Sequence, residues 1–398
     1  MITVEEASEI INQNLYKPTT EGVELSKVLG RVLAEDIYAD RDFPPFNRVM
    51  MDGIAIQYKS WESGARSFKK EGIQLAGEPQ KTLKDSGSCL EVMTGSILPE
   101  NSDVVIPYEE LEDAGEMIHV RLNQVKKNQN IHSQGADVKV SEKILSKGCL
   151  ISTAEIGVLA TVSKSVIKVF SLPKVAIIST GDELVAVEET PKDYQIRQSN
   201  SHVLKATLKE SEVEADIYHI LDERDLLLTR LKAIVEEVDV LILSGGVSKG
   251  KKDYVPEVLN QLGFQKQFHG VIQRPGKPFW FGVRQDNKTV FALPGNPVST
   301  YLCYQKYIKK WLYSSLGIDL KPEYAVLSED FNFKKELTYF LQVKVSNESG
   351  KLMAMPVAGQ GSGDLANLIS ADGFLQLPAD RSLFKAGEVF PFIRYRRS

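Results

Sequence analysis

The spacing of hydrophobic and polar positions changes along the chain, and it separates stretches rich in strands from one stretch in which strands and helices alternate. From Lys174 onward, short apolar runs alternate with stretches whose apolar residues recur every three to four positions. Strands are predicted at 175–179, 215–221 and 238–243, and helices at 198–210, 225–237 and from 255 onward. This alternation predicts a parallel sheet with right-handed crossovers.

The second half of this stretch predicts a hairpin and a long helix. Apolar runs at 279–283 and 289–293 are joined by a polar turn, which is typical of a hairpin. A helix is predicted at 297–316, because Asn296 is a good N-cap and Pro297 suits the first helical position. Asp253 is predicted to be the N-cap of the helix that begins at residue 255.

The stretches on either side have other patterns. Thr3 and Glu6 form a potential capping box for an N-terminal helix, and a second helix is predicted at 25–32. Residues 58–130 have turn residues at intervals typical of short strands, which predicts a small β-rich domain. After Pro322 the pattern alternates again in strands at 341–345, 352–356 and 387–392, as in a small β-barrel.

Composition narrows the class of protein. At 398 residues the chain is long enough for more than one domain, and a net charge of −5 disfavours binding to nucleic acid. The three cysteines are far apart and form no CxxC motif, which argues against a zinc site and favours a reducing compartment. No apolar run approaches 18 residues, and no signal peptide is evident, so we expect a cytoplasmic protein without a membrane span.

Candidate chemistry gathers where the predicted parallel strands end. The polar residues at these positions are Asp182, Glu183, Asp222, Ser244, Ser248 and Asp253. Each could be an ordinary cap or turn residue, but open α/β sheets bind ligands at this shared edge. Three loops there, at 244–250, 274–278 and 293–297, carry Gly, Pro and a few cations. Bare N–H groups and helix N-termini favour anions, so these loops predict an anion site.

Two further residues are ambiguous from the pattern alone. Asp52 lies in a turn before a predicted strand at 54–57, and Thr94 lies in a turn that also contains Gly95 and Ser96. Both residue types are common in turns for structural reasons, and the pattern favours that interpretation.

Eight sequence stretches occur in the order and at the spacings of one known family. They are MDGIA (51–55), VMTGSILPENSDVVI (92–106), GADVK (135–139), TGDEL (180–184), SGGVSKGKKDY (244–254), RPGKP (274–278), LPGNPVS (293–299) and GQGSGDL (359–365). The chain resembles the molybdopterin molybdenumtransferases of the MoeA type, which are related to the second domain of gephyrin. The resemblance covers nearly the whole chain.

This resemblance implies a multidomain fold of α/β and β parts. A split elongated domain would comprise 1–44 and 131–172, with a β-rich domain inserted at 45–130. A molybdopterin-binding α/β domain with a central parallel sheet would comprise 173–318, and a C-terminal β-barrel 319–398. The resemblance also implies an elongated homodimer, with the active site between the α/β domain of one subunit and the inserted domain of the other.

The implied activity is the insertion of molybdate into adenylylated molybdopterin with release of AMP, assisted by a divalent cation such as Mg²⁺. The family's catalytic positions match Asp52, Thr94, Glu183, Asp222 and Asp253, and the last three would hold Mg²⁺. This reverses the structural interpretation of Asp52 and Thr94. The implied substrate-binding residues are Thr180, Gly181, Asp182, Ser244, Gly245, Gly246, Ser248, Lys249, Arg274, Pro275, Gly276, Lys277, Pro278, Pro294, Gly295, Asn296, Pro297, Ser299 and Ser362.

Two positions depart from the family pattern, and two rival functions follow from the same resemblance. The family usually has a small apolar residue where Lys249 stands and often Lys where Arg274 stands, so the sequence does not decide between molybdate and tungstate as the oxyanion.

One rival is the adenylyltransferase that makes adenylylated molybdopterin, which shares only the α/β domain and is also a candidate partner. The other rival is a scaffold that binds molybdopterin without catalysis.

Overall fold

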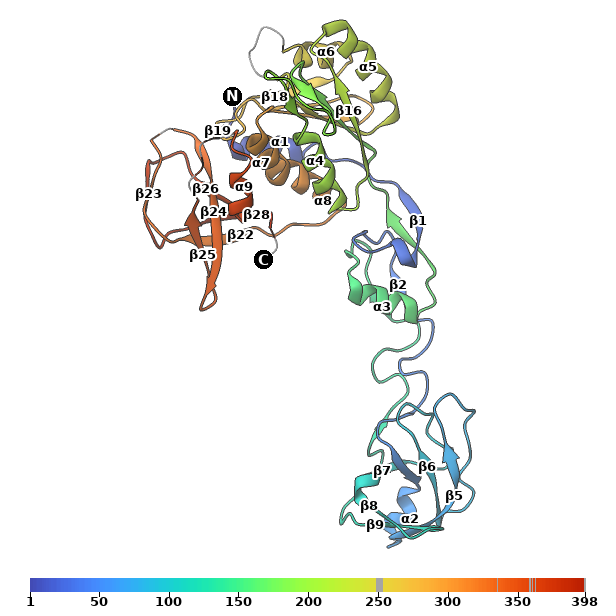
Figure 1. Ribbon diagram of the computed structural model, residues 1–398. Coiled ribbons are helices and arrows are strands. Elements are labelled where there is room, and N and C mark those ends of the chain that lie inside the picture. Colours follow the sequence, from blue (N-terminus) through green and yellow to red (C-terminus); the bar gives the residue numbers. More distant parts are fainter. Residues whose placement is uncertain (248–252, 335, 358, 360, 362, 397–398) are drawn as a thin grey trace. The chain divides into compact units, whose positions relative to one another are not determined.

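The computed structural model describes residues 1–247, 253–334, 336–357, 359, 361 and 363–396 (Figure 1). The chain forms two compact units. The first unit contains Met1–Gly22, Gly30–Ala34 and Lys168–Ser398, and the second contains Val23–Leu29 and Glu35–Ile167. In the described part of the chain, every helix is too short or too polar to cross a membrane.

A six-stranded sheet is the centre of the first unit. In spatial order its strands are β16 (Ala215–Ile220), β13 (Val175–Thr180), β17 (Val240–Ser244), β21 (Thr289–Leu293), β20 (Trp280–Val283) and β18 (Gln265–His269). The first four are parallel, which confirms the predicted parallel sheet. Strands β20 and β21 form the predicted antiparallel hairpin, and β18 extends it at the edge.

Helices cover both faces of this sheet (Figure 1). One face packs against α5 (Arg224–Glu237) and α6 (Val255–Gln261), and the other against α1 (Val4–Asn12), α4 (Asn200–Lys209), α7 (Pro297–Cys303) and α8 (Lys309–Ser315). Successive strand residues point to opposite faces, so Ile242 packs on the α4 side and Leu243 on the α5 side. All five side chains of β17 are buried, which explains its continuous apolar run.

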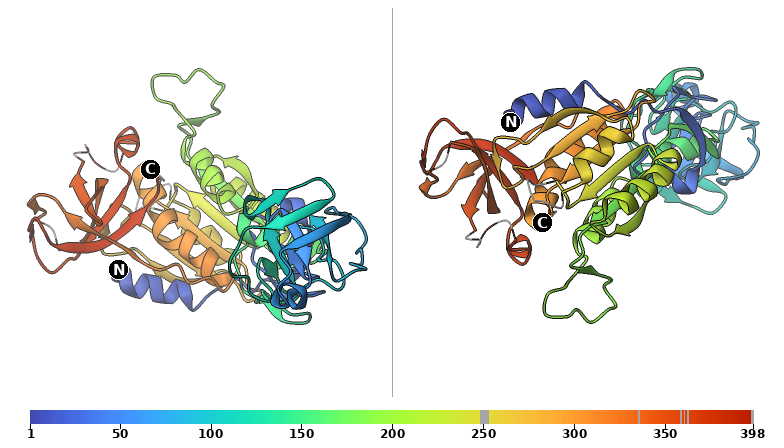
Figure 2. Two further views of the ribbon diagram at one scale, coloured as in Figure 1. Left: turned by 90° about the horizontal axis from the view of Figure 1, so that it is seen from below. Right: turned by 90° about the horizontal axis from the view of Figure 1, so that it is seen from above.

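A closed five-strand β-barrel forms the C-terminal part of the first unit. Its strands are β24 (Thr338–Glu348), β25 (Lys351–Pro356), β22 (Glu323–Leu327), β28 (Val389–Arg394) and β26 (Gly373–Leu377), and β26 returns to pair with β24. The short strand β19 (Gln273–Arg274) pairs with β24. The remaining elements of this unit are β23 (Phe331–Asn332), β27 (Leu383–Phe384), α9 (Asn367–Ser370), β14 (Leu184–Val185) and β15 (Ile196–Arg197). The stretch between β14 and β15 projects from the α/β part (Figure 2).

The second unit is built on another six-stranded sheet. Its strands, in order, are β7 (Val104–Pro107), β4 (Gly53–Ile56), β6 (Ser88–Val92), β5 (Ser67–Gln74), β9 (Met117–Val120) and β8 (Leu111–Asp113). Two-stranded sheets of this unit pair β2 (Ile37–Tyr38) with β11 (Lys143–Leu145) and β3 (Arg48–Val49) with β10 (Ile131–His132). Another two-stranded sheet pairs β1 (Thr20–Glu24) with β12 (Val166–Phe170), and its residues are divided between the two units. The helices are α2 (Tyr58–Glu62), α3 (Thr153–Thr161) and the 3₁₀ turns η1 (Leu25–Lys27) and η2 (Tyr108–Glu110).

Two local predictions were wrong, and a third was confirmed with a local irregularity. The helix predicted at 25–32 is only the turn η1, and Gly30 with φ of +75° reverses the chain soon after it. The cap position of α6 is Tyr254 rather than Asp253. The helix predicted at 297–316 is confirmed over 297–315, where α7, the π-helical segment Tyr304–Ile308 and α8 follow one another without a gap. The π-helical segment inserts an extra residue into the helical turn.

Candidate functional site

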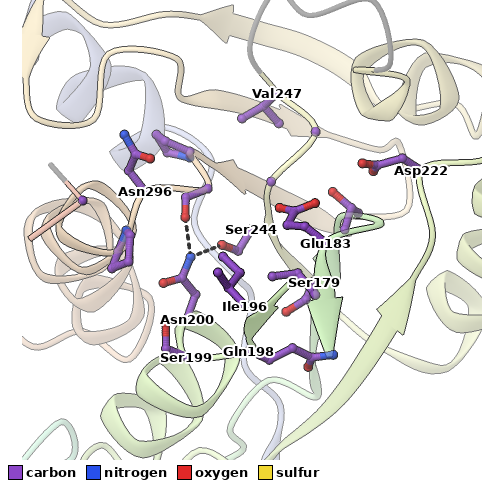
Figure 3. Close-up of a pocket in the computed structure, with 18 of the residues that line it drawn as sticks. Ser179, Glu183, Ile196, Gln198, Ser199, Asn200, Asp222, Ser244, Val247 and Asn296 are labelled. Carbon is purple, nitrogen blue, oxygen red and sulfur yellow. Dashed lines mark hydrogen bonds between the residues drawn. The ribbon is translucent and has the colours of Figure 1, made fainter. Parts of the chain in front are cut away.

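A cavity of about 700 Å³ opens at the carboxyl edge of the α/β sheet (Figure 3). The ends of β13, β17 and β21 and the start of α4 all contribute to it, as expected for an open parallel sheet. Its lining contains many of the predicted residues: Thr180, Glu183, Asp222, Ser244, Gly245, Gly246, Asp253, Pro278, Pro294, Gly295, Asn296 and Pro297.

The glycine loop after β17 lies directly over Thr180. Gly245 and Gly246 have φ of +104° and +67°, and a Cβ atom at Gly245 would lie 2.6 Å from the carbonyl oxygen of Thr180. Thr180 is only 4% exposed, and its Oγ1 has no hydrogen-bond partner among the residues that the structure describes. Buried hydroxyl groups are normally satisfied, so a polar ligand atom would remove a real energetic cost here.

Asn200, the first residue of α4, ties two of the loops together (Figure 3). Its Nδ2 donates to Ser244 Oγ at 2.9 Å and to the carbonyl oxygen of Gly295 at 2.7 Å. It therefore holds the end of β17 against the loop that follows β21. Sequence reasoning did not single out Asn200, although the predicted start of this helix at the same edge was an available signal.

Other lining residues were also missed. In this cavity they are Ser179, Leu184, Ile196, Arg197, Gln198, Ser199, Val247 and Gly363. Val247 lies in the loop 244–250 that was predicted as part of the anion site, and Leu184 and Gly363 belong to the TGDEL and GQGSGDL stretches, but none of the three was predicted individually. The other five residues lie outside the eight stretches and carry no motif by which sequence alone would mark them.

Three carboxylates line the acidic part of the cavity: Glu183, Asp222 and Asp253. Asp182 lies beside them and accepts a hydrogen bond from the Asp222 N–H at 3.0 Å. Among the residues that the structure describes, no three carboxylate, histidine or cysteine side chains are close enough to enclose a metal ion. Mg²⁺ commonly uses one or two carboxylates together with substrate phosphates and water, so these side chains suit a cation that arrives with a phosphorylated ligand.

A second cavity of about 510 Å³ adjoins the first and shares Pro278, Pro294 and Asn296 with it. It brings together further predicted residues, namely Arg274, Pro275, Gly276, Lys277 and Ser299. The lining also includes Gln273, Glu336 and Leu337, which sequence reasoning missed. Two cations beside a buried serine form a setting suited to a small oxyanion.

Asp52 and Thr94 come together in the second unit. The Thr94 N–H and Oγ1 donate to the same oxygen of Asp52, at 2.6 and 2.7 Å. The backbone hydrogen bond, followed by the hydroxyl one, lowers the pKa of Asp52 below its ordinary value. Asp52 is therefore an ionised carboxylate held in one orientation.

The other predicted residues lie outside the two cavities or outside the described chain. Gly181 precedes the acidic part, and its carbonyl oxygen lies 3.0 Å from His219 Nε2. Ser248, Lys249, Gly250 and Ser362 lie outside the described residues. The roles assigned to all of these residues stay predictions.

Comparisons with known proteins agree along the chain. Residues 2–163 match the MoeA N-terminal region (domains I and II), 176–314 a probable molybdopterin-binding domain, and 324–395 the MoeA C-terminal region (domain IV). A molybdopterin molybdenumtransferase of Synechocystis is 41% identical over 98% of this chain and 99% of its own length. One from Staphylococcus epidermidis is 31% identical over 98% of this chain and 95% of its own.

Solved structures give the same result for the fold. Two crystal structures of a molybdopterin biosynthesis MoeA protein from Pyrococcus horikoshii superimpose with TM-scores of 0.84. Their sequence identities are 29% and 27%, and the matches cover 100% and 99% of this chain and 100% of each structure.

Proposed function

Because the chain belongs to the molybdopterin molybdenumtransferase (MoeA) family, we propose that it inserts molybdate into adenylylated molybdopterin and releases AMP. It is a transferase of molybdenum cofactor biosynthesis. The observation that carries the specific reaction is the pair of adjoining cavities, one polar and partly acidic, the other lined by Arg274 and Lys277. A phosphorylated substrate and a tetrahedral oxyanion need adjacent sites of this kind.

The larger cavity would hold the phosphates of the substrate. The Gly246 N–H, together with the Thr180 hydroxyl, which has no partner among the described residues, would present donors to an anion. The Gly245 N–H already donates to the carbonyl oxygen of Leu293 at 3.2 Å. Breaking the phosphoanhydride bond that joins AMP to molybdopterin depends mainly on positioning and on stabilising negative charge. Asn200 would hold the loop after β17 and the loop after β21 in fixed positions during that step.

We propose Mg²⁺ as the cation of this site. Glu183, Asp222 and Asp253 would hold it together with substrate phosphate oxygens. When bound, it would neutralise charge on the phosphate that leaves with AMP.

The smaller cavity would receive molybdate. Arg274 and Lys277 supply positive charge, and Ser299 can donate a hydrogen bond to an oxyanion. The sulfur atoms that take the metal belong to the substrate, so the protein needs no thiol for this chemistry. Burial raises the pKa of Cys89 to about 12, in keeping with a structural role.

Four further assignments belong to this proposal. The domains divide at 45, 131, 173 and 319, and the chain works as a homodimer in the cytoplasm. Asp52 and Thr94 act on the substrate bound by the partner subunit's α/β domain, for which their rigid hydrogen-bonded arrangement is suited. The adenylyltransferase that makes the substrate is a candidate partner. A scaffold without catalysis remains the alternative function, because it would keep the same cavities.

An AMP-release assay separates these functions. Purified protein is mixed with adenylylated molybdopterin, Mg²⁺ and either molybdate or tungstate, and AMP is followed over time. We expect release that depends on the oxyanion, and loss of release in Asp253→Asn. Asp193→Asn, in the exposed segment between β14 and β15, is the matched control and should keep the wild-type rate. Substrate binding without oxyanion-dependent release would instead establish the scaffold.

A further inference from the structure

The loop that carries Arg274 and Lys277 rests on a buried polar network. Gln273, immediately before it, is 0% exposed, and Tyr307 beneath it is 2% exposed. The Tyr307 hydroxyl donates to Gln273 Oε1 at 2.5 Å, and Gln273 Nε2 donates to the carbonyl oxygen of Gly276 at 3.3 Å. A chain of two hydrogen bonds thus connects Tyr307 to the middle of the loop.

The directions of these hydrogen bonds are fixed by chemistry. The carbonyl oxygen of Gly276 can only accept, so the amide nitrogen of Gln273 must face it. The amide oxygen of Gln273 then faces Tyr307, whose hydroxyl must donate. Burial raises the pKa of Tyr307 well above its ordinary value, so the hydroxyl keeps its proton across the working pH range. Loss of that hydroxyl would leave a buried amide oxygen unsatisfied.

Gly276 lets the loop pack in direct contact with Gln273. Its φ is +93°, and a Cβ atom there would lie 2.5 Å from Gln273 Nε2 and 2.8 Å from Cys303 Sγ. The loop therefore packs directly on Gln273, and a turned or displaced Gln273 side chain would move it. Because Arg274 and Lys277 flank this contact, their positions depend on it.

Tyr307 reaches the loop from the π-helical segment. Tyr304 in the same segment is also buried, but its hydroxyl donates to the carbonyl oxygen of Thr207 in α4. The extra residue of a π-turn changes the direction of the side chains that follow it. The segment thus contains two buried tyrosines, of which one supports the loop and the other supports α4.

We propose that Gln273 and Tyr307 are positioning residues for the oxyanion: they set the places of Arg274 and Lys277, while their own side-chain polar atoms are engaged in the hydrogen bonds described above. This inference rests on the proposed function, because it takes the smaller cavity to be the molybdate site. It predicts that damage to the network weakens oxyanion binding more than it slows the reaction of the fully bound enzyme.

The test compares two tyrosine variants. Tyr307→Phe should raise the KM for molybdate roughly tenfold, the effect of one lost buried hydrogen bond, with little change in kcat at saturating adenylylated molybdopterin. Tyr304→Phe loses an equally buried hydroxyl from the same segment but should keep the wild-type KM. Melting temperatures of both variants show whether the comparison is made at similar stability.

A second variant tests the connection itself. Gln273→Met keeps the approximate shape of the side chain and should raise the KM to a similar extent. The double variant Gln273→Met/Tyr307→Phe should be no worse than Gln273→Met alone, because both changes break one network. Gln273→Met also provides the test if Tyr307→Phe does not fold.

Direct titration of molybdate by calorimetry separates the inference from the proposed function. If the wild type binds molybdate but releases no AMP, the proposed reaction fails, and weaker binding by Tyr307→Phe would still support the positioning role. If Tyr307→Phe and Tyr304→Phe have the same KM and the same molybdate affinity, the positioning role is wrong.

Discussion

Thr94 controls the charge of a single carboxylate. Two hydrogen bonds from Thr94 stabilise the ionised form of Asp52 and lower its pKa. Thr94→Val keeps the backbone hydrogen bond but removes the hydroxyl one, so the pKa of Asp52 should rise. Because Asp52 must be ionised in the proposed reaction, the acid limb of the pH–rate profile should move to higher pH. Carboxyl ¹³C chemical shifts of Asp52 measure the same change without activity.

Thr94→Ser is the matched control for this prediction. It restores a hydroxyl at the same distance along the side chain, so both the pH profile and the Asp52 chemical shift should return towards wild type. An unchanged Asp52 titration in Thr94→Val would show that the backbone N–H alone sets the pKa.

Single residues also mark where sequence reasoning reached its limit. The edge position of Glu183, Asp222 and Ser244 followed from strand ends, because topology alone brings such residues together. The predicted helix start placed Asn200 near the same edge, but the partners of Asn200 and of Gln273 could not be assigned in this way. Their importance comes from contacts with residues far away in sequence, including Gly295 and Tyr307, and local patterns contain no information on such pairs.

At the level of elements, two capping boxes provide a paired prediction. Thr3 caps α1 in the first unit with Glu6, and Ser152 caps α3 in the second unit with Glu155. Replacing either cap with Ala should cost about 1 kcal/mol of helix stability, because an N–H group loses its partner. Hydrogen exchange followed by mass spectrometry should show Thr3→Ala speeding exchange in α1 alone, and Ser152→Ala in α3 alone. Faster exchange throughout either unit would contradict a local effect.

Helices and strands could be predicted where the pattern of apolar residues matched the side chains that are buried. Strand β17 was found because burial on both faces requires a continuous apolar run. Helix α5 was found because burial of one stripe leaves apolar residues at helical spacing. The segment 25–32 has apolar residues at suitable spacing, yet Val28 and Val32 are buried in a chain that is not helical. The π-helical segment between α7 and α8 could not be predicted from the sequence pattern. Its two tyrosines, Tyr304 and Tyr307, make hydrogen bonds to residues that are distant in the sequence.

At the level of the whole first unit, one lysine joins segments from three regions of the sequence. Lys306 Nζ, in the π-helical segment, donates to Gln376 Oε1 of the barrel strand β26 at 2.7 Å. Gln376 Nε2 in turn donates to Glu5 of α1 at 3.3 Å. Burial lowers the pKa of Lys306 to about 8, against an attraction from Glu5 that raises it. The junction between helix, barrel and α1 therefore contains an ammonium group whose charge is disfavoured by folding.

The stability of this junction should depend on pH in a defined direction. Below pH 8, Lys306 is charged in the folded and unfolded chain, and its burial opposes folding. Between pH 8 and its ordinary pKa of 10.5, the unfolded chain binds more protons, so this residue's contribution to the unfolding free energy rises with pH. Lys306→Met removes the contribution. The variant's stability relative to wild type should thus be greater at pH 7 than at pH 10, by on the order of 2 kcal/mol.

Comparing variant with wild type at each pH cancels the opposite effect of the buried tyrosines and cysteines, whose raised pKa values cost stability at high pH. Guanidinium unfolding followed by fluorescence is suitable, because Trp280 and Trp311 are buried in the first unit. Lys232→Met, at an exposed position of α5, is the matched control, because Lys310 itself contributes to the lowered pKa of Lys306. A difference between Lys306→Met and wild type that is the same at both pH values would mean that the Lys306 ammonium is as well solvated in the folded chain as in the unfolded one.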